Sequence, residues 1–212
     1  MQLNEKKCNY MVFSRSETKF ATRLHLNNVL LEKIPATKLL GVWVTEELSW
    51  SRNCREICIK AYSRLSLLTK LKYVGVRIED LVEIYTLYIR SLTEYCSVAF
   101  HPSLTIEQSH TLERIQKTCL RVILGEMYLS YESALEMTGL MTLHSRREKR
   151  CLDFALKCIK HPRNSQLFPL NNRTNGHTFT TKEKFIVNWA RTNSYRDSTI
   201  PYCQRLLNKH FK

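Results

Sequence analysis

The side chains that could catalyse phosphoryl transfer are few in this chain of 212 residues. Such chemistry needs carboxylates that hold two metal ions about 4 Å apart. The chain has three aspartates, Asp80, Asp153 and Asp197, and only Asp80 stands next to another acid, Glu79. Acids at the start of a helix serve as caps or as partners of its positive end. We therefore expect no catalytic residue and no metal site in this chain.

The cysteines and histidines form no recognisable metal-ligand pattern. The eight cysteines include no Cys-x-x-Cys pair, and Cys151, Cys158 and His161 lack a fourth ligand at a usual spacing. Residues 1–20 contain no apolar signal core, which favours an intracellular protein of the nucleus or cytoplasm with reduced thiols. The thiols are therefore interpreted as small core residues. No stretch is apolar enough to span a membrane, so we expect no membrane partner.

The net charge gives the clearest indication of a partner. The chain has 33 Lys and Arg against 19 Asp and Glu, a formal charge of +14. Such an excess favours a polyanionic partner, most simply nucleic acid. The alternatives are a generically basic soluble protein and a protein that binds an anionic membrane surface.

A strand-like run and a basic helix follow one another in residues 38–72. The apolar run at 42–44, with Gly41 before it, predicts a buried strand with a close backbone approach at the glycine. Ser49 or Ser51 can cap the helix. Its apolar stripe comprises Trp50, Cys54, Ile57, Cys58, Ala61, Leu65 and Leu68. The opposite half carries Arg52, Arg55, Lys60, Arg64 and Lys70, with Glu56 as its acid.

Several short motifs, in this order, resemble the C-terminal part of reverse transcriptases from non-LTR retrotransposons of the LINE type, jockey-like elements in particular. The first is Leu-Leu-Gly-Val-x-Val-x-x-x-Leu-Ser-Trp at 39–50, which the basic helix follows. The others are the runs at 88–96 and 112–117, the Arg146-Arg147 pair, and the runs at 198–202 and 204–208. The resemblance covers nearly the whole chain.

The resemblance implies roles for particular residues. Leu40, Gly41 and Val42 match the primer-grip strand, and the basic face of the helix after it matches the thumb surface that follows a nucleic-acid duplex. It also implies three parts: the end of the palm at 1–48, a thumb-like bundle at 49–169 and a basic connection at 170–212.

Arg146 and Arg147 join the expected nucleic-acid contacts. They begin a helix whose opening turns also carry Lys149 and Arg150. Cations near the positive end of a helix are unfavourable, so an anion or acidic partner nearby would explain them. The alternative is a solvated face that includes Glu148.

The family enzyme is an Mg²⁺-dependent, RNA-directed DNA polymerase, whose aromatic-Ala-Asp-Asp box and fingers have no counterpart in this sequence. We therefore expect the chain alone to be inactive and to hold no cofactor. Its expected partners are the backbone of an RNA/DNA duplex, bound weakly and without sequence preference, and the missing palm and fingers. The alternative is a non-catalytic, helical protein-interaction module or a non-functional relic of a mobile element.

The predicted fold is α+β, with a small antiparallel sheet followed by a mainly α-helical bundle. Asn27-Asn28 predicts a hairpin turn in the sheet. The predicted helices cover about 79–100, Thr105 to Gly125 with Gln108 completing a capping box, 130–137, and 142–160. A linker is expected at 171–176. The tail after it mixes cations with aromatic residues, which suits either base stacking or docking of a helix through its aromatic side chains.

Overall fold

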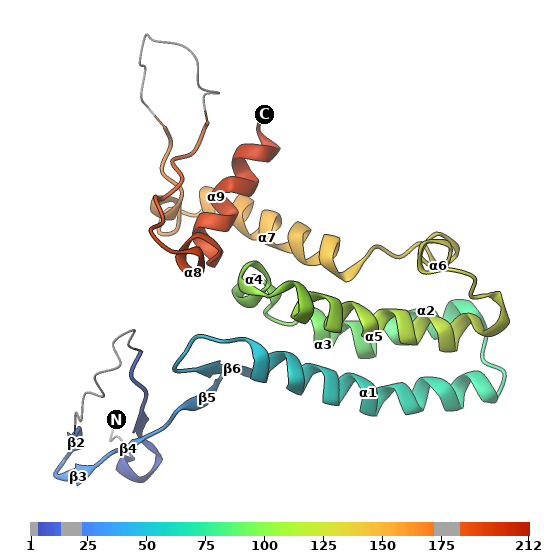
Figure 1. Ribbon diagram of the computed structural model, residues 1–212, viewed down its shortest axis with the longest axis horizontal. Helices are drawn as coiled ribbons and strands as arrows, with labels where there is room; N and C mark the ends of the chain where they lie inside the picture. Colours follow the sequence, from blue (N-terminus) through green and yellow to red (C-terminus); the bar gives the residue numbers. More distant parts are fainter. Residues whose placement is uncertain (1–3, 14–22, 172–182) are drawn as a thin grey trace. The chain divides into compact units, whose positions relative to one another are not determined.

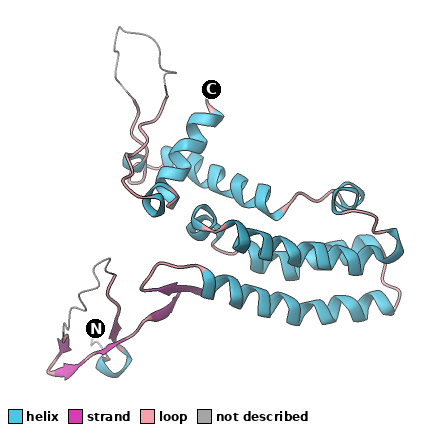
Figure 2. Cartoon of the chain, viewed as in Figure 1, coloured by secondary structure: helices cyan, strands magenta, loops and turns pink. Residues whose placement is uncertain are grey.

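The computed structural model describes residues 4–13, 23–171 and 183–212, so most of the predicted linker at 171–176 lies outside the described residues. The chain forms two compact units, Met1–Glu56 and Ile57–Lys212. Short strands lie in the first unit, and the second unit is mainly helical (Figure 1; Figure 2). The predicted α+β class, with antiparallel strand pairs before a helical region, is confirmed.

The strands described in the first unit form separate pairs instead of one sheet. After the short helix η1 (Glu5–Lys7), β1 (Asn9–Tyr10) pairs in parallel with β4 (Glu32–Lys33). Strands β2 (His25–Leu26) and β3 (Val29–Leu30) form an antiparallel hairpin. Its turn residues, Asn27 and Asn28, have φ values of 49° and 66°, which confirms the predicted turn.

The strand predicted at 42–44 is confirmed, but the close backbone approach predicted at Gly41 is wrong, because residues 38–44 do not form one strand. This region belongs to a hairpin of β5 (Ala36–Leu39) and β6 (Val42–Thr45), joined by Leu40 and Gly41. Their φ values are 46° and 89°, so both turn residues lie in the left-handed region that matches the twist of a two-residue hairpin. Gly41 therefore permits a tight turn and does not mark a close approach within a strand.

Helix α1 (Ser51–Tyr73) confirms the predicted basic helix and contains the boundary at Glu56. Cys54, Ile57, Ala61 and Leu68 are buried, as their spacing predicts. At its start, the Asn53 side chain accepts a hydrogen bond of 3.2 Å from the backbone N–H of Trp43. This bond connects the first turn of the helix to β6.

The second unit continues with helices of very different lengths. The longest are α5 (Ile106–Leu124) and α7 (Leu143–Lys160), followed by α9 (Thr199–His210). The shorter elements are α2 (Ile78–Ile84), η2 (Tyr85–Arg90), α3 (Ser91–Glu94), α4 (Ser97–Phe100), η3 (His101–Ser103), η4 (Gly125–Met127), α6 (Tyr131–Thr138), η5 (Ser165–Leu167) and α8 (Asn193–Arg196).

The helix predicted over residues 79–100 is divided. A wide π-helical turn, η2, follows α2. The helix is interrupted after α3, where Cys96 has a φ of 54°. Neither glycine nor proline marks this break in the sequence, which is why the apolar periodicity alone predicted one continuous helix. Inside η2, the carbonyl of Tyr88 accepts a hydrogen bond from the guanidinium of Arg64 on α1.

The helix ends predicted after residue 104 are confirmed. Thr105 and Gln108 form the expected capping box on α5, through bonds of 3.0 and 3.1 Å between side chain and backbone N–H. Ser130 caps α6, and Thr142 caps α7. These ends fix where each helix presents its polar side chains.

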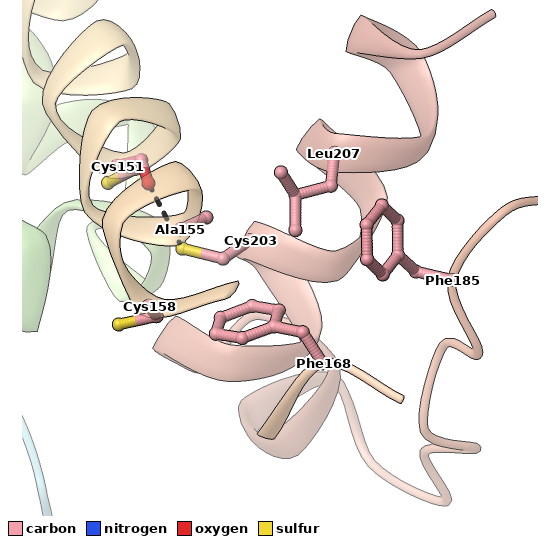
Figure 3. Packing of buried hydrophobic residues seen from close by; sticks show 7 residues of the cluster. All are labelled: Cys151, Ala155, Cys158, Phe168, Phe185, Cys203 and Leu207. Atoms are coloured by element: carbon pink, nitrogen blue, oxygen red, sulfur yellow. Dashed lines mark hydrogen bonds between the residues drawn. The ribbon is translucent and has the colours of Figure 1, made fainter. Parts of the chain in front are cut away.

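The tail packs on α7 and belongs to the second unit, where the sequence suggested a separate segment. The shared core contains Cys151, Ala155, Cys158, Phe168, Phe185, Cys203 and Leu207 (Figure 3). Cys203 points from α9 to α7, where its thiol donates to the Cys151 carbonyl at 3.5 Å. Asn208 forms two hydrogen bonds with the backbone of Phe185, which ties the segment before α8 to α9. All eight cysteines are free thiols, and five are buried.

Across residues 4–13, 23–171 and 183–212, no helix combines the length and the apolar character needed to cross a membrane.

Candidate nucleic-acid interface

The cations predicted on α1 are on its surface. Arg52, Arg55, Lys60 and Lys70 are exposed, and Arg64 is half-buried. Arg52 and Arg55 also line a shallow hollow with Ser51 and Glu56. The polar half of the helix therefore presents positive charge to solvent, as its spacing predicted.

Two of these cations are held by aromatic rings. The Arg52 guanidinium lies 3.6 Å from the centre of the Trp43 ring. The Arg64 guanidinium lies 4.2 Å from the centre of the Tyr88 ring and donates to the Tyr88 carbonyl. Arg55, Lys60 and Lys70 make no hydrogen bond or ion pair with the described part of the chain. These three are thus the α1 cations best placed to meet a phosphate.

The predicted primer-grip residues occupy a hairpin tip. Leu40 is 83% exposed in the turn, Gly41 completes the turn, and Val42 starts β6 with its side chain buried. A turn presents few backbone groups along a line, unlike an extended strand edge. The three residues are therefore adjacent without forming the continuous strand that the sequence suggested.

Arg147 corrects another expectation. Its side chain is 0% exposed, and it donates to Nδ1 of His101 at 3.4 Å and to Oγ of Ser109 at 3.2 Å. A fully buried guanidinium cannot meet a phosphate on the surface. Arg147 therefore joins α7 to η3 and α5 and leaves the set of candidate phosphate contacts.

Arg146 and Arg150 share a carboxylate that the sequence did not connect to them. Glu94, at the end of α3, is 4% exposed and accepts hydrogen bonds from both guanidinium groups. Arg90 Nε lies 3.6 Å from the same carboxylate. Burial raises the pKa of Glu94, but the hydrogen bonds and charges of Arg146 and Arg150 outweigh it and hold the pKa below its ordinary value.

A second carboxylate meets the N-terminus of α7. The two oxygens of Glu113, on α5, accept hydrogen bonds from the backbone N–H groups of Leu143 and His144, at 2.9 and 3.1 Å. A carboxylate at this position offsets the positive end of the helix. The acidic partner expected near the α7 cations is thus found within the chain, as Glu94 and Glu113.

Even so, α7 keeps an exposed cationic stripe. Positions 146, 149, 150, 153, 154 and 157 follow three- and four-residue steps and lie on one side of the helix. With Val98 and Met141, they line a hollow of about 470 Å³. Lys149 and Lys157 are exposed and pair with no acid in the described ranges. Asp153 is the acid among the residues that line this hollow.

The sequence contained part of the information needed to find the cationic stripe of α7. The spacing of Arg146, Lys149, Arg150 and Lys157 on a predicted helix could have revealed the stripe. No local pattern connects Arg146 to Glu94, which lies 52 positions away. That contact exists only because α3 packs beside α7.

No cluster of three or more His, Cys, Asp or Glu side chains that could hold a metal ion occurs within the described ranges.

Comparison with protein-family models, with curated proteins and with solved structures found no match to this chain.

Proposed function

We propose that the chain binds the phosphate backbone of nucleic acid, weakly and without reading base sequence, as the thumb-like part of a fragment related to non-LTR reverse transcriptases. The relationship rests on the order of the sequence motifs alone. The binding role rests on one observation, the exposed cations Lys149, Arg150 and Lys157 beside the hollow of α7, with the half-buried Arg146 next to them. The proposal assigns polymerisation and its Mg²⁺ ions to the palm of the family enzyme.

The spacing of the free cations suits a phosphate backbone. Lys149 and Lys157 are two helical turns apart, about 12 Å along the axis at 1.5 Å per residue. A duplex carries one charge in about every 1.7 Å of its length, so both ammonium groups find phosphates in one bound segment. Lysines provide point charges on flexible stems, which position a backbone without selecting bases. Arg55, Lys60 and Lys70 are further exposed cations, on α1.

A specific observation favours a second function, a non-catalytic protein-interaction module. Leu40 exposes 83% of its surface at the β5–β6 tip, and Val98, Met141 and Phe154 add apolar surface to the cationic hollow of α7. An acidic peptide with an apolar anchor would match that hollow.

Competition between the two ligand classes tests the proposal. The purified chain is titrated with two labelled duplexes of unrelated sequence, and an acidic peptide of matched charge is used as competitor, all at one salt concentration. We expect both duplexes to bind with similar affinity and the peptide to displace them poorly. Tighter binding of the peptide than of either duplex would contradict the proposal and favour the interaction module.

A further inference from the structure

A separate cavity of about 520 Å³ opens in the second unit, between η3, the first turns of α5 and the N-terminus of α7. The residues that matter for its chemistry are His101, Ser109, Glu113, Tyr131, His144 and Tyr202. Its volume lies within the range of about 300–1,000 Å³ that is common for small-molecule sites. The cations of the α7 hollow do not line it.

The floor of the cavity presents a neutral imidazole. His101 is 6% exposed, and its Nδ1 accepts a hydrogen bond from Arg147. Because a guanidinium only donates, Nδ1 carries the lone pair and Nε2 carries the proton. Nε2 lies 3.5 Å from the Tyr202 hydroxyl, a long contact that leaves both groups capacity for a stronger partner. Burial, with the charges of Arg147 and His144, lowers the pKa of His101 to about 3.

Aromatic rings surround this floor. The His101 and His144 ring centres are 5.1 Å apart with planes at 74°, and those of His101 and Tyr202 are 5.8 Å apart at 89°. Rings set at right angles present both faces and edges to one space. His144 is exposed, so its ring lies at the mouth. This arrangement suits a flat ligand.

Glu113 makes the cavity a poor site for an anion. Its carboxylate already accepts hydrogen bonds from the first N–H groups of α7, where an anion would bind, and from the Tyr131 hydroxyl. A ligand that enters here meets that carboxylate, a neutral imidazole, hydroxyl groups and one ammonium group, that of Lys117. The ammonium of Lys117 lies over the Tyr131 ring, 4.8 Å from its centre.

We propose that this cavity binds a single unstacked nucleobase, whose ring packs on His144 and Tyr202 and whose polar edge bonds to His101 Nε2 and the Tyr202 hydroxyl. A nucleobase is flat, uncharged and has donors and acceptors on its edge, which are the properties that this lining selects. Its identity as the ligand rests on the proposed nucleic-acid binding function. The site would hold one base of a single strand or of a free nucleotide.

Uncharged nucleosides test this site without involving the phosphate contacts. Calorimetric titration of the full chain with adenosine and cytidine should give saturable binding that changes little with salt. The same titration with ribose 5-phosphate should give none. Binding of ribose 5-phosphate without binding of nucleosides would show an anion site and overturn the proposal, as would the absence of any nucleoside binding.

Two variants locate the site. His144→Ala removes an exposed ring, and stacking on an aromatic side chain contributes about 1–3 kcal/mol per base, so nucleoside affinity should fall roughly 5-fold or more. Tyr202→Phe keeps the ring and removes the hydroxyl, and it should weaken nucleoside binding while the fold, followed by circular dichroism, is retained. Unchanged affinity in both variants would place nucleoside binding elsewhere and overturn the proposal.

A third variant separates this inference from the proposed function. Lys149→Gln with Lys157→Gln changes only the α7 hollow, so nucleoside affinity should match that of the wild type. If the base comes from a single strand, the fluorescence of a strand that contains 2-aminopurine should rise on binding. If only free nucleotides bind, the site is assigned to free nucleotides. If duplexes bind with the expected salt dependence and nucleosides do not bind, the proposal of a nucleobase site is wrong. The proposed binding of the phosphate backbone is then still supported.

Discussion

Arg150 Nη2 lies 2.7 Å from Oε2 of Glu94, although the two residues are 56 positions apart in the chain. The same carboxylate also accepts hydrogen bonds from Arg146, and Arg90 lies 3.6 Å away. One buried acid therefore organises three guanidinium groups from α7 and the η2–α3 segment. The arrangement leaves excess positive charge beside the hollow of α7.

Replacement of Glu94 by glutamine should destabilise the second unit strongly. The change leaves three guanidinium groups without their shared charge, and breaking a buried ion pair typically costs about 3–5 kcal/mol. Chemical denaturation measures the free energy of unfolding. Asp80→Asn is the matched control, because the Arg77–Asp80 pair is exposed and ion pairs in water contribute little to stability. Equal losses in the two variants would contradict the role of Glu94.

His101 should make stability depend on pH. Its pKa is about 3 in the folded chain and 6.5 ordinarily, so between these values the unfolded chain binds the extra proton. The free energy of unfolding should therefore fall as pH drops from 6.5 towards 3, by up to about 1.4 kcal/mol per pH unit from this residue. His101→Gln should lack this component in denaturation curves at several pH values. A slope in His101→Gln that equals that of the wild type would contradict this role of His101.

Tyr85→Phe tests the buried hydrogen-bond chain that connects η2, α5 and α6. The Tyr85 hydroxyl donates to Gln116 at 2.6 Å, and Gln116 donates to Tyr131 and to the Met141 carbonyl. Loss of the hydroxyl leaves a buried acceptor unsatisfied, at a cost of about 1–3 kcal/mol. Tyr88→Phe, at a partly exposed ring, should change the free energy of unfolding by under about 0.5 kcal/mol. An unchanged free energy of unfolding in Tyr85→Phe would show that these hydrogen bonds contribute little to stability.

Local signals predicted the helices well and their partners poorly. Thr105 with Gln108, Ser130 and Thr142 predicted helix starts because capping acts over a few residues. The break at Cys96 had no such marker, since a left-handed cysteine is held by the surrounding fold and not by its own preference. Gly41 was correctly identified as special, but its neighbours did not distinguish a hairpin turn from a strand.

For the candidate sites too, local patterns predicted positions on a helix but not contacts between distant residues. Spacing alone placed Arg55, Lys60 and Lys70 on an exposed helix face, because helical geometry is local. It could not tell Arg146 from its neighbour Arg147, one half-buried beside Glu94 and the other fully buried beside His101. The cavity around His101 combines residues from 101 to 202, so only the packed chain brings them together.

The cations of α1 should contribute to duplex binding independently of α7. Arg55, Lys60 and Lys70, changed together to glutamine, should weaken binding and flatten the plot of log affinity against log salt by up to about 2.7 units if each meets one phosphate. Arg64 is left unchanged, because it binds the Tyr88 carbonyl and its loss would disturb packing. Thermal unfolding should be nearly unchanged, since the three side chains are exposed. An unchanged salt slope in the folded variant would show that this face is only solvated.

The salt dependence of duplex affinity, measured for the wild type and for the Lys149→Gln, Lys157→Gln variant, tests the central claim most directly. Each phosphate contact adds about 0.9 to the slope for DNA, so the variant should bind more weakly with a slope lower by up to about 1.8. Lys209→Gln, an exposed cation on α9, should leave the slope as in wild type. Two results would contradict phosphate-backbone binding by this stripe: no duplex binding by the wild type, or an α7 variant with the same slope as the wild type.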